Sequence, residues 1–367
     1  MNERLNKDNS YSADIIITLL AILLMSCLYH GARSLIVCLI SCLSCYFFEL
    51  IALKLQNKKI AFHDYSAVIT GLIIGLMMPA TIKYSILVVI SFVAMIVGKH
   101  VFGTSGFEIF NPAAVAYVFA ALCWPLQVLS YPVTTTKLSI ANYVDVTKVS
   151  SFSSQFNAGQ ALPSLNIETL LGYFDGPIGC TQMFVIFVCA IVLILRRSVS
   201  ISAFLGFVGT YMVVCYLIPF ETNIDITDYL FYELTTNMLL FAALFIVSDY
   251  RFLPTGSLNR FIIGALTALL TLLFRRVGNA ENAVMFAVLI ANPFVDVVDN
   301  YHTRLVAFIR GNEGDDNNDL FSYVLRFITG FGAAFALVFV KIKDFFIGLF
   351  KKERPSAVEV RDTDEEE

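Results

Sequence analysis

Charged residues are scarce in this chain of 367 residues, because Asp, Glu, Lys and Arg together make up only 15% of it. A soluble domain carries about 25% charged residues. Hydrophobic residues reach 57% and the mean hydropathy is +0.74. This composition excludes an ordinary soluble domain and indicates an integral membrane protein. We expect the lipid bilayer to be its main solvent, and we expect no nucleic-acid partner.

Patterns that bind metal or haem are also missing. The four histidines stand alone near the ends of apolar stretches, which argues against paired axial haem ligands. Among the eight cysteines only Cys42 and Cys45 form a C-x-x-C, whereas an iron–sulfur cluster normally takes four Cys ligands. Together with Cys38 they share one face of an expected helix. We interpret this face as a helix-packing surface and expect no metal site.

Apolar stretches of spanning or nearly spanning length dominate residues 14 to 298. Eight are clear, and two are shorter or broken. They cover residues 14–29, 34–53, 65–80, 84–98, 113–131, 182–195, 200–219, 236–248, 260–274 and 281–298. A helix needs about 20 residues to cross the hydrocarbon core, so the shorter pieces must tilt, lie half-buried or meet another broken piece inside the protein.

The order of short span, polar break, long span, Gly-containing turn and span occurs in both halves. Paired breaks of this kind indicate an internal repeat with a site at its interface. The sequence therefore predicts an all-α polytopic membrane protein with about ten transmembrane helices. The expected parts are a cytoplasmic N-terminus (1–13), a first membrane repeat (14–131), an extracytoplasmic loop (132–181), a second membrane repeat (182–298), a polar linker (299–320), an amphipathic or membrane helix (321–350) and a disordered acidic tail (351–367).

Basic residues in the short loops predict the orientation. If the spans alternate, one side gathers most of them, and the positive-inside rule makes that side cytoplasmic. These residues are Lys54, Lys58, Lys59, Arg196, Arg197 and Arg251. Arg275 and Arg276 are the exception, since the same alternation places them on the extracytoplasmic side. We expect the first helix to stay in the mature protein and not to be a cleaved signal peptide, because no small-residue cleavage site lies between it and the second span, at Ala32 and Arg33.

Two polar interruptions are the best candidates for a site. The first is a Gly-rich turn over residues 99–112, where Asn111 suits the N-cap and Pro112 the first turn of a new helix. A helix N-terminus at membrane depth favours phosphate, carboxylate or an electron-rich ring edge, although an ordinary capped turn is the alternative. The second interruption covers residues 249–256.

Ionisable residues inside or beside the spans can likewise be functional or structural. An unpaired charge at mid-membrane costs about 2.5 to 3.5 kcal/mol on insertion scales, so such residues face the interior or a wet cavity. Interior roles are expected for Glu49, Asp64 and Asp249, either on an ion path or in structural pairs. Asp296 is expected to be solvated.

Several spaced motifs carry a family resemblance. They are D-x-S-A-x-x-T-G at 64–71, G-K-H-V-F-G at 98–103, F-N-P-A at 110–113, G-P-I-G at 176–179, and Ser248-Asp249 with Pro254-Thr255. In these places the chain resembles the RnfD family of membrane proteins from the Rnf electron-transport complex and the related NqrB family from the sodium-pumping NADH:quinone reductase. The resemblance covers roughly residues 12 to 300.

The resemblance implies two inverted five-helix repeats in a prokaryotic cytoplasmic (inner) membrane. It also implies a translocase assembly of membrane and peripheral subunits, in which electron transfer is coupled to sodium or proton movement. It further implies flavin, as FMN or riboflavin. In the family an FMN phosphate is joined to a Thr in an outer-loop motif that matches residues 157–163 here. Gly159 fits that motif, but the acceptor position is Ala161, which has no hydroxyl. We therefore expect any flavin to be noncovalent.

The candidate site follows from the interruptions and the resemblance together. We expect the two turns to surround a flavin ring, with Asn111 and Thr70 donating hydrogen bonds and Phe102 or Phe110 stacking. The cofactor-binding candidates are Thr70, Lys99, Phe102, Gly103, Phe110, Asn111, Pro112, Gly159, Asp249 and Thr255. No catalytic residue is assigned. The alternatives are a small-solute channel or transporter of inverted-repeat fold and a flavin-free scaffold subunit of a redox complex.

Overall fold

The computed structural model describes most of the chain up to Asp299. The described residues are 2–299 without 58–64, 102–107, 134–137, 139–147, 150, 152–154, 157–170, 220–224 and 279–280. The expectations for Asp64, Phe102, Gly103, Gly159 and Ala161 fall outside this part. The same holds for the expected C-terminal helix and acidic tail.

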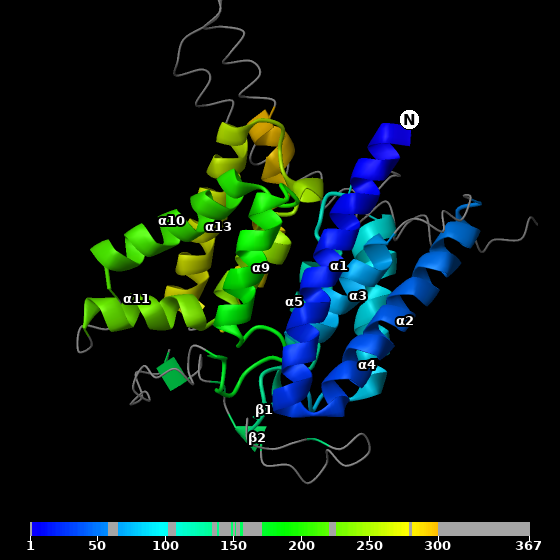
Figure 1. Cartoon of the computed structure of the whole chain (residues 1–367), viewed down its shortest axis with the longest axis horizontal. Coiled ribbons are helices and arrows are strands. Elements are labelled where there is room, and N and C mark those ends of the chain that lie inside the picture. Colours follow the sequence, from blue (N-terminus) through cyan, green and yellow to red (C-terminus); the bar gives the residue numbers. More distant parts are fainter. Residues whose placement is uncertain are drawn as a thin grey trace, which may run out of the picture. The chain divides into compact units, whose positions relative to one another are not determined.

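Helices make up nearly all of the described secondary structure (Figure 1). The first half contains α1 (Asn2–His30), α2 (Ala32–Leu55), α3 (Ser66–Met77), α4 (Tyr84–Phe92) with its π-helical continuation η1 (Val93–Val101), α5 (Pro112–Cys123) and α6 (Pro125–Val128). The second half contains α9 (Met183–Leu195), α10 (Ile201–Leu217), α11 (Ile226–Thr235), α12 (Leu239–Ala242) with its π-helical continuation η2 (Ala243–Val247), the 3-10 turn η3 (Tyr250–Phe252), α13 (Ser257–Gly278) and α14 (Ala283–Ala291). Two short strands, β1 (Tyr131–Pro132) and β2 (Lys148–Val149), pair antiparallel.

Among the described residues, four helices are long and apolar enough to cross a membrane: Tyr11–His30, Ala32–Leu55, Tyr84–Val101 and Ser257–Val277. Helix α11 and the segment Leu239–Val247, bent by 57°, form a fifth candidate, and four more apolar helices are shorter. The all-α membrane class is confirmed. Each of the ten expected stretches contains a helix, although several of these helices are too short to span alone.

Two expected spans are shorter or interrupted in the structure. Helix α5 stops at Cys123, because Trp124 leaves the helical region (φ −133°, ψ 56°) just before Pro125. A residue before proline is pushed out of the helical conformation by the proline ring. Helix α14 stops at Ala291, but Asn292 keeps helical angles (φ −55°, ψ −45°), and residues 294–299 are helical again after a turn. The span predicted to residue 131 was therefore too long, whereas the stretch predicted to residue 298 is helical to its end and is interrupted at residues 292–293.

Glycines let α3 approach the cysteine face of α2. A Cβ placed on Gly71 would lie 2.6 Å from the Cα of Cys42, and one on Gly75 would lie 2.9 Å from the Sγ of Cys38. Real side chains do not occupy such distances, so only glycine allows this contact between backbones. The interpretation of the cysteine face as a packing surface is confirmed.

Contacts within the bundle define two ends, which we call inner and outer after the side of the membrane that the charge count predicts for each. At the inner end, the Tyr11 hydroxyl donates to Asp249, and Arg196 pairs with Asp14. At the outer end, the N–H of Leu138 donates to the carbonyl of His30, near β1 and β2 (Figure 1). Lys54, Arg196 and Arg251 accordingly share the inner end, as the charge count predicted.

The outer Arg275 has a buried counter-ion. Its guanidinium pairs with the carboxylate of Glu233, and it also donates to the hydroxyl of Tyr211. The side chains of Arg275 and Glu233 are 9% and 2% exposed. The Glu233 carboxylate thus compensates the buried charge of Arg275, one of the two exceptions to the charge count, whereas Arg276 donates to the carbonyl of Ile218.

The end of α3 is closed by the G-P-I-G loop and by a buried arginine. The N–H of Gly179 donates to the carbonyl of Leu76, and that of Ile178 to the carbonyl of Met78. Arg33, which is fully buried, donates to the carbonyls of Ala80 and Ile82. A helix end inside a membrane needs such donors for its unpaired carbonyls.

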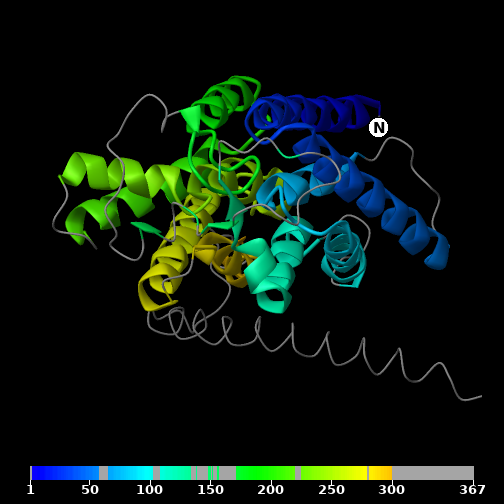
Figure 2. The ribbon, with the colours of Figure 1, turned by 90° about the horizontal axis from the view of Figure 1, so that it is seen from below.

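The two halves meet through pairs of helices from each. Helix α1 packs against α9, and α5 packs against α14. Figure 2 shows α1 beside α9 and the aqua α5 beside the orange α14. The polar turns that follow η1 and η2 therefore belong to one packed unit.

Candidate functional site

A polar cluster lies at the inner end, where η1 meets α2 and α3. The ammonium of Lys99 donates to Glu49 Oε1 at 2.9 Å and to Ser66 Oγ at 2.5 Å. Glu108 Oε1 lies 4.0 Å from the same nitrogen. Glu49 and Lys99 are 7% and 9% exposed. We call these residues, together with His100, Tyr11, Asp249 and Arg251, the inner polar cluster.

His100 gives Glu49 its second partner. The imidazole Nε2 lies 2.8 Å from Glu49 Oε2, and Nδ1 lies 3.2 Å from the amide nitrogen of Gln56. In this arrangement the amide donates to Nδ1, so a neutral imidazole carries its proton on Nε2 and donates it to the carboxylate. Both oxygens of Glu49 are thus hydrogen-bonded.

Asp249 anchors the second part of the cluster. Its Oδ1 accepts from the Tyr11 hydroxyl at 2.7 Å and from the backbone N–H of Arg251 at 3.0 Å. Its Oδ2 pairs with Arg251 Nη2 at 2.7 Å. Asp249 is 3% exposed, whereas the Arg251 side chain is 29% exposed. Asp249 thus joins α1 to the turn that follows η2.

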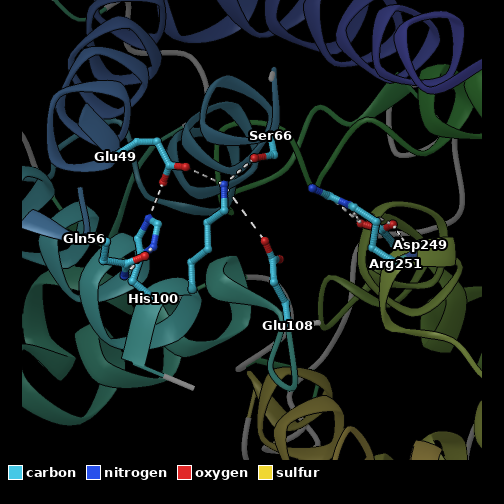
Figure 3. Close-up of polar contacts among 8 residues, drawn as sticks. Glu49, Gln56, Ser66, His100, Glu108, Asp249 and Arg251 are labelled. Atoms are coloured by element: carbon cyan, nitrogen blue, oxygen red, sulfur yellow. Dashed lines mark hydrogen bonds and ion pairs between the residues drawn. The ribbon is translucent and has the colours of Figure 1, made fainter. Parts of the chain in front are cut away.

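The two parts of the cluster face each other. Figure 3 shows the Arg251 side chain extending toward the space between Ser66 and Glu108. Glu108 lies within electrostatic range of the Arg251 guanidinium. The structure therefore brings the first interruption and the second interruption to one place, with three carboxylates, two cationic groups and one imidazole.

Both parts of the cluster sit at the ends of π-helical segments. Lys99 and His100 lie in η1, and Asp249 follows η2 by two residues. π-helical turns are rare and often occur at functional sites, because the extra residue per turn redirects the side chains that follow. The Ser248 hydroxyl returns to the carbonyl of Ala243, five residues earlier, at the end of η2.

The buried charges of the cluster restrict what it can do. Removing one partner of a buried ion pair costs about 3 to 5 kcal/mol, because the other charge is left without compensation. Glu49 has two partners and Lys99 has three neighbouring oxygens. Such a network can exchange one cation for another while each carboxylate keeps a hydrogen bond.

Asn111 caps α5, as its sequence position predicted. Its Oδ1 accepts from the N–H groups of Ala113 and Ala114 at 3.0 and 3.4 Å, and Pro112 is the first residue of the helix. A Cβ on Gly98 would lie 3.1 Å from the Cα of Pro112, so η1 approaches this helix start closely. The cap occupies N–H groups that an anion would otherwise bind.

The other predicted site residues lie partly in the inner polar cluster and partly elsewhere. Lys99 and Asp249 belong to the inner polar cluster, and Thr70 and Phe110 are buried. Thr255 is exposed, and its N–H and hydroxyl donate to Asp299 Oδ2 at 2.8 and 2.9 Å. Thr255 thus belongs to a separate polar contact beside α13. Of the ion-path candidates, Glu49 and Asp249 are buried and paired, and Asp64 lies outside the described residues. Asp296 is exposed, as expected.

Sequence reasoning missed five members of the cluster. They are Tyr11, Ser66, His100, Glu108 and Arg251. His100 and Arg251 had a local signal, since each follows closely on a residue that was chosen. Tyr11 had none, because its partner Asp249 lies 238 positions away.

The fold and the cluster define a class of protein: a multi-pass α-helical membrane protein with ionisable residues gathered at broken helices. Residues 5–307 match the model of the family described as NQR2, RnfD, RnfE. The chain belongs to this family, which confirms the resemblance drawn from the motifs.

Individual relatives agree with the family assignment. A protein of Actinobacillus succinogenes is 27% identical over 80% of this chain and 92% of its own length, and one of Shewanella frigidimarina is 27% identical over 73% and 85%. Both are named as the D component of an ion-translocating oxidoreductase complex. A protein of Clostridium ljungdahlii, named as the D component of a proton-translocating ferredoxin:NAD(+) oxidoreductase complex, is 24% identical over 72% and 79%.

Proposed function

We propose that this chain is the RnfD-type membrane component of an Rnf-type ion-translocating electron-transport complex in a prokaryotic inner membrane. Its work is to help pass electrons across the membrane while sodium ions or protons move. The family membership and the names of its relatives support this proposal. The observation that carries it is the inner polar cluster, which is assembled from both halves of the chain.

We propose that the cluster is the inner end of an ion path. Glu49 and Asp249 are buried carboxylates, and each is held by groups that can move: the Lys99 ammonium, the His100 imidazole and the Arg251 guanidinium. Ionisable residues inside membrane proteins commonly mark ion paths. A sodium ion or proton that reaches Glu49 would take the place of Lys99 while the hydrogen bond from His100 remains.

A noncovalent FMN or riboflavin is the cofactor that we propose. The cationic groups Lys99 and Arg251 suit an electron-rich ring edge or a phosphate, and the buried Phe110 is an aromatic neighbour of the turn. When bound, a flavin would supply the redox chemistry. The fit is weaker at Asn111, because its oxygen already caps α5.

The two halves are proposed to be inverted five-helix repeats that together supply about ten transmembrane helices. Helix α3 begins beside the inner cluster and runs away from it, whereas η2 runs toward the cluster and ends just before Asp249. Helix α3 is too short to span alone, and η2 belongs to the bent pair of α11 and Leu239–Val247. Helix α3 belongs to the third span of the first half, and η2 belongs to the third span of the second half. In an inverted repeat, equivalent spans of the two halves run in opposite directions.

Other membrane and peripheral subunits of the complex are the proposed partners, because the relatives are named as parts of a complex. A small-solute transporter is the second candidate function, since broken helices with ionisable residues also occur in transporters. A flavin-free scaffold subunit is the third.

One purification separates the three candidate functions. The chain is purified with its neighbours, and a flavin spectrum is recorded before and after acid precipitation. We expect flavin in the complex, released into the supernatant by acid. A complex that transfers electrons with no flavin on this protein identifies the scaffold, and a chain that purifies alone and moves a solute identifies the transporter.

A further inference from the structure

A buried carboxyl that belongs neither to the inner polar cluster nor to the Arg275–Glu233 pair lies at the outer end of the bundle. Glu281 belongs to the connection between α13 and α14, outside both helices, and it is 7% exposed. Within the described residues, no Lys, Arg or His nitrogen lies within ion-pair distance of it. A carboxylate that is buried without a cation is unfavourable, so Glu281 needs another means of neutralisation.

Hydroxyl groups surround this carboxyl. Ser151, Tyr131 and Tyr117 lie close enough to this carboxyl to interact with it electrostatically. Ser151 is 1% exposed, and both tyrosines are fully buried. The hydroxyl oxygens of Tyr117 and Tyr131 make no hydrogen bond to any of the described groups. Fully buried hydroxyls without hydrogen-bond partners are rare in proteins, and they point to a missing ligand.

These groups come from four separate segments of the chain. Tyr117 lies in α5, Tyr131 in β1 and Ser151 two residues beyond β2, while Glu281 precedes α14. Helices α5 and α14 are one of the contacts between the two halves. The thiol of Cys180 is the remaining titratable group near the carboxyl, and its Sγ is directed to the carbonyl of Leu76. The site therefore lies where the outer segment covers the junction of the halves.

We propose that Glu281, Tyr131, Ser151 and Tyr117 form a binding site for a monovalent cation, H⁺ or Na⁺, at the outer end of the contact between α5 and α14. One carboxyl and three hydroxyl oxygens are a hard, all-oxygen ligand set that suits Na⁺, whereas H⁺ would bind to the carboxylate itself. A bound cation would neutralise the carboxylate and satisfy the tyrosine hydroxyls. The use of the site in ion transport rests on the proposed function, whereas cation binding itself does not.

The protonation of the carboxyl agrees with this site. Burial raises the pKa of Glu281 to about 7, against the opposing influence of the nearby Ser151 and Tyr131 hydroxyls. At neutral pH the group can therefore take up or release a proton without leaving its site.

An infrared pH titration tests the site. The full chain, purified with its neighbours, is titrated in chloride salts of sodium or choline, and the carbonyl band of a buried protonated carboxyl is followed. Glu281→Gln keeps the size of the side chain and removes the titration. Asp225→Asn removes an exposed carboxyl at the same end and is the matched control.

We expect a band that titrates near pH 7 in the wild type and in Asp225→Asn, and that is absent in Glu281→Gln. If sodium binds, the midpoint falls by about one pH unit for each tenfold rise in sodium above its dissociation constant. A midpoint that is equal in sodium and choline identifies a proton site. A wild type with no such band above about pH 6 overturns the proposal, because an ordinary Glu is ionised there.

Tyr131→Phe keeps the proposal testable if Glu281→Gln does not fold. Loss of the hydroxyl that stabilises the carboxylate is expected to raise the midpoint, and an unchanged midpoint contradicts the site. Electron flux is measured on the same samples. If the wild type titrates as expected but electron flux and ion transport are unchanged in Glu281→Gln, the cation site stands and only its role in transport is disproved.

Discussion

Lys99 and Glu49 form an ion pair of 2.9 Å between η1 and α2, with 10% and 9% of their side chains exposed. The pair is joined to His100 and Ser66, so it connects three helices at the inner end. A buried network of this kind is stable only while every charge has a partner. Substitutions at single positions should therefore cost more than the loss of the whole pair.

Breaking this pair is the first prediction. Glu49→Gln leaves the Lys99 ammonium buried without its carboxylate, and we expect the complex to lose about 3 kcal/mol of stability. Glu49→Gln combined with Lys99→Met should be less destabilised than Glu49→Gln alone, since no unpaired charge remains. Thermal unfolding of the detergent-solubilised complex measures both variants.

Lys83→Met is the control for the ion pair. Lys83 is exposed and makes no side-chain cap at the start of α4. Its loss is expected to change stability by less than about 0.5 kcal/mol, as at most surface positions. Two results would show that Glu49 and Lys99 are not coupled. One is an equal loss of stability in Lys83→Met and Glu49→Gln. The other is a variant with both Glu49→Gln and Lys99→Met that is less stable than either single variant.

The predictable part of the site was the part encoded locally. Asn111 and Pro112 follow a Gly-rich turn and precede an apolar run, and the structure has the cap at the expected residue. The ion pair of Glu49 with Lys99 could not be predicted in the same way, because it joins residues 50 positions apart. Its geometry depends on the close approach of α2, α3 and η1.

The ends of the helices also depend partly on neighbouring residues and partly on residues distant in the sequence. Each of the ten hydrophobic runs contains a helix, but the run to residue 131 gave no weight to the break at Trp124 and Pro125, and α11 lies outside all ten runs. The π-helical register of η1, which sets the directions of Lys99 and His100, has no recognisable pattern in the sequence. Tertiary packing decides such a register.

The second prediction concerns orientation. The loop at 54–64 should be cytoplasmic and the segment 132–181 extracytoplasmic, because Lys54, Arg196 and Arg251 share the inner end. A single cysteine at position 58 should react with an impermeant reagent only after the membrane is opened. A single cysteine at position 153 should react in intact cells. Labelling of position 58 from outside would reverse the orientation.

The third prediction is that any flavin on this protein is released by denaturation. Ala161 has no oxygen for a phosphoester, although it stands where the family motif has its acceptor Thr. In-gel fluorescence after SDS should show no band at the mass of this chain. Ala161→Thr with Ala158→Ser should restore attachment in a host that has the attaching enzyme. A fluorescent band from the unmodified protein would mean that another residue is the acceptor.

The fourth prediction separates a cofactor role of Asn111 from its role as a helix cap. Asn111→Ala removes the two hydrogen bonds to Ala113 and Ala114, and a lost N-cap costs about 1 kcal/mol. If Asn111 only caps α5, the loss of stability is the whole effect, and electron flux per assembled complex stays unchanged. If the side chain also donates to a flavin, flux or flavin content falls by more than the amount of folded complex does.

Thr70→Val and Asn111→Asp complete this test. Thr70→Val keeps the shape of a buried side chain in α3 and removes only its hydroxyl. Asn111→Asp keeps the cap, because a carboxylate oxygen accepts from the same N–H groups, but it removes the amide donor. We expect Asn111→Asp to keep the stability of the wild type and to lose flux. Full flux per assembled complex in all three variants would end the flavin-site proposal at this turn, and the inner polar cluster would then remain as an ion site without a flavin beside it.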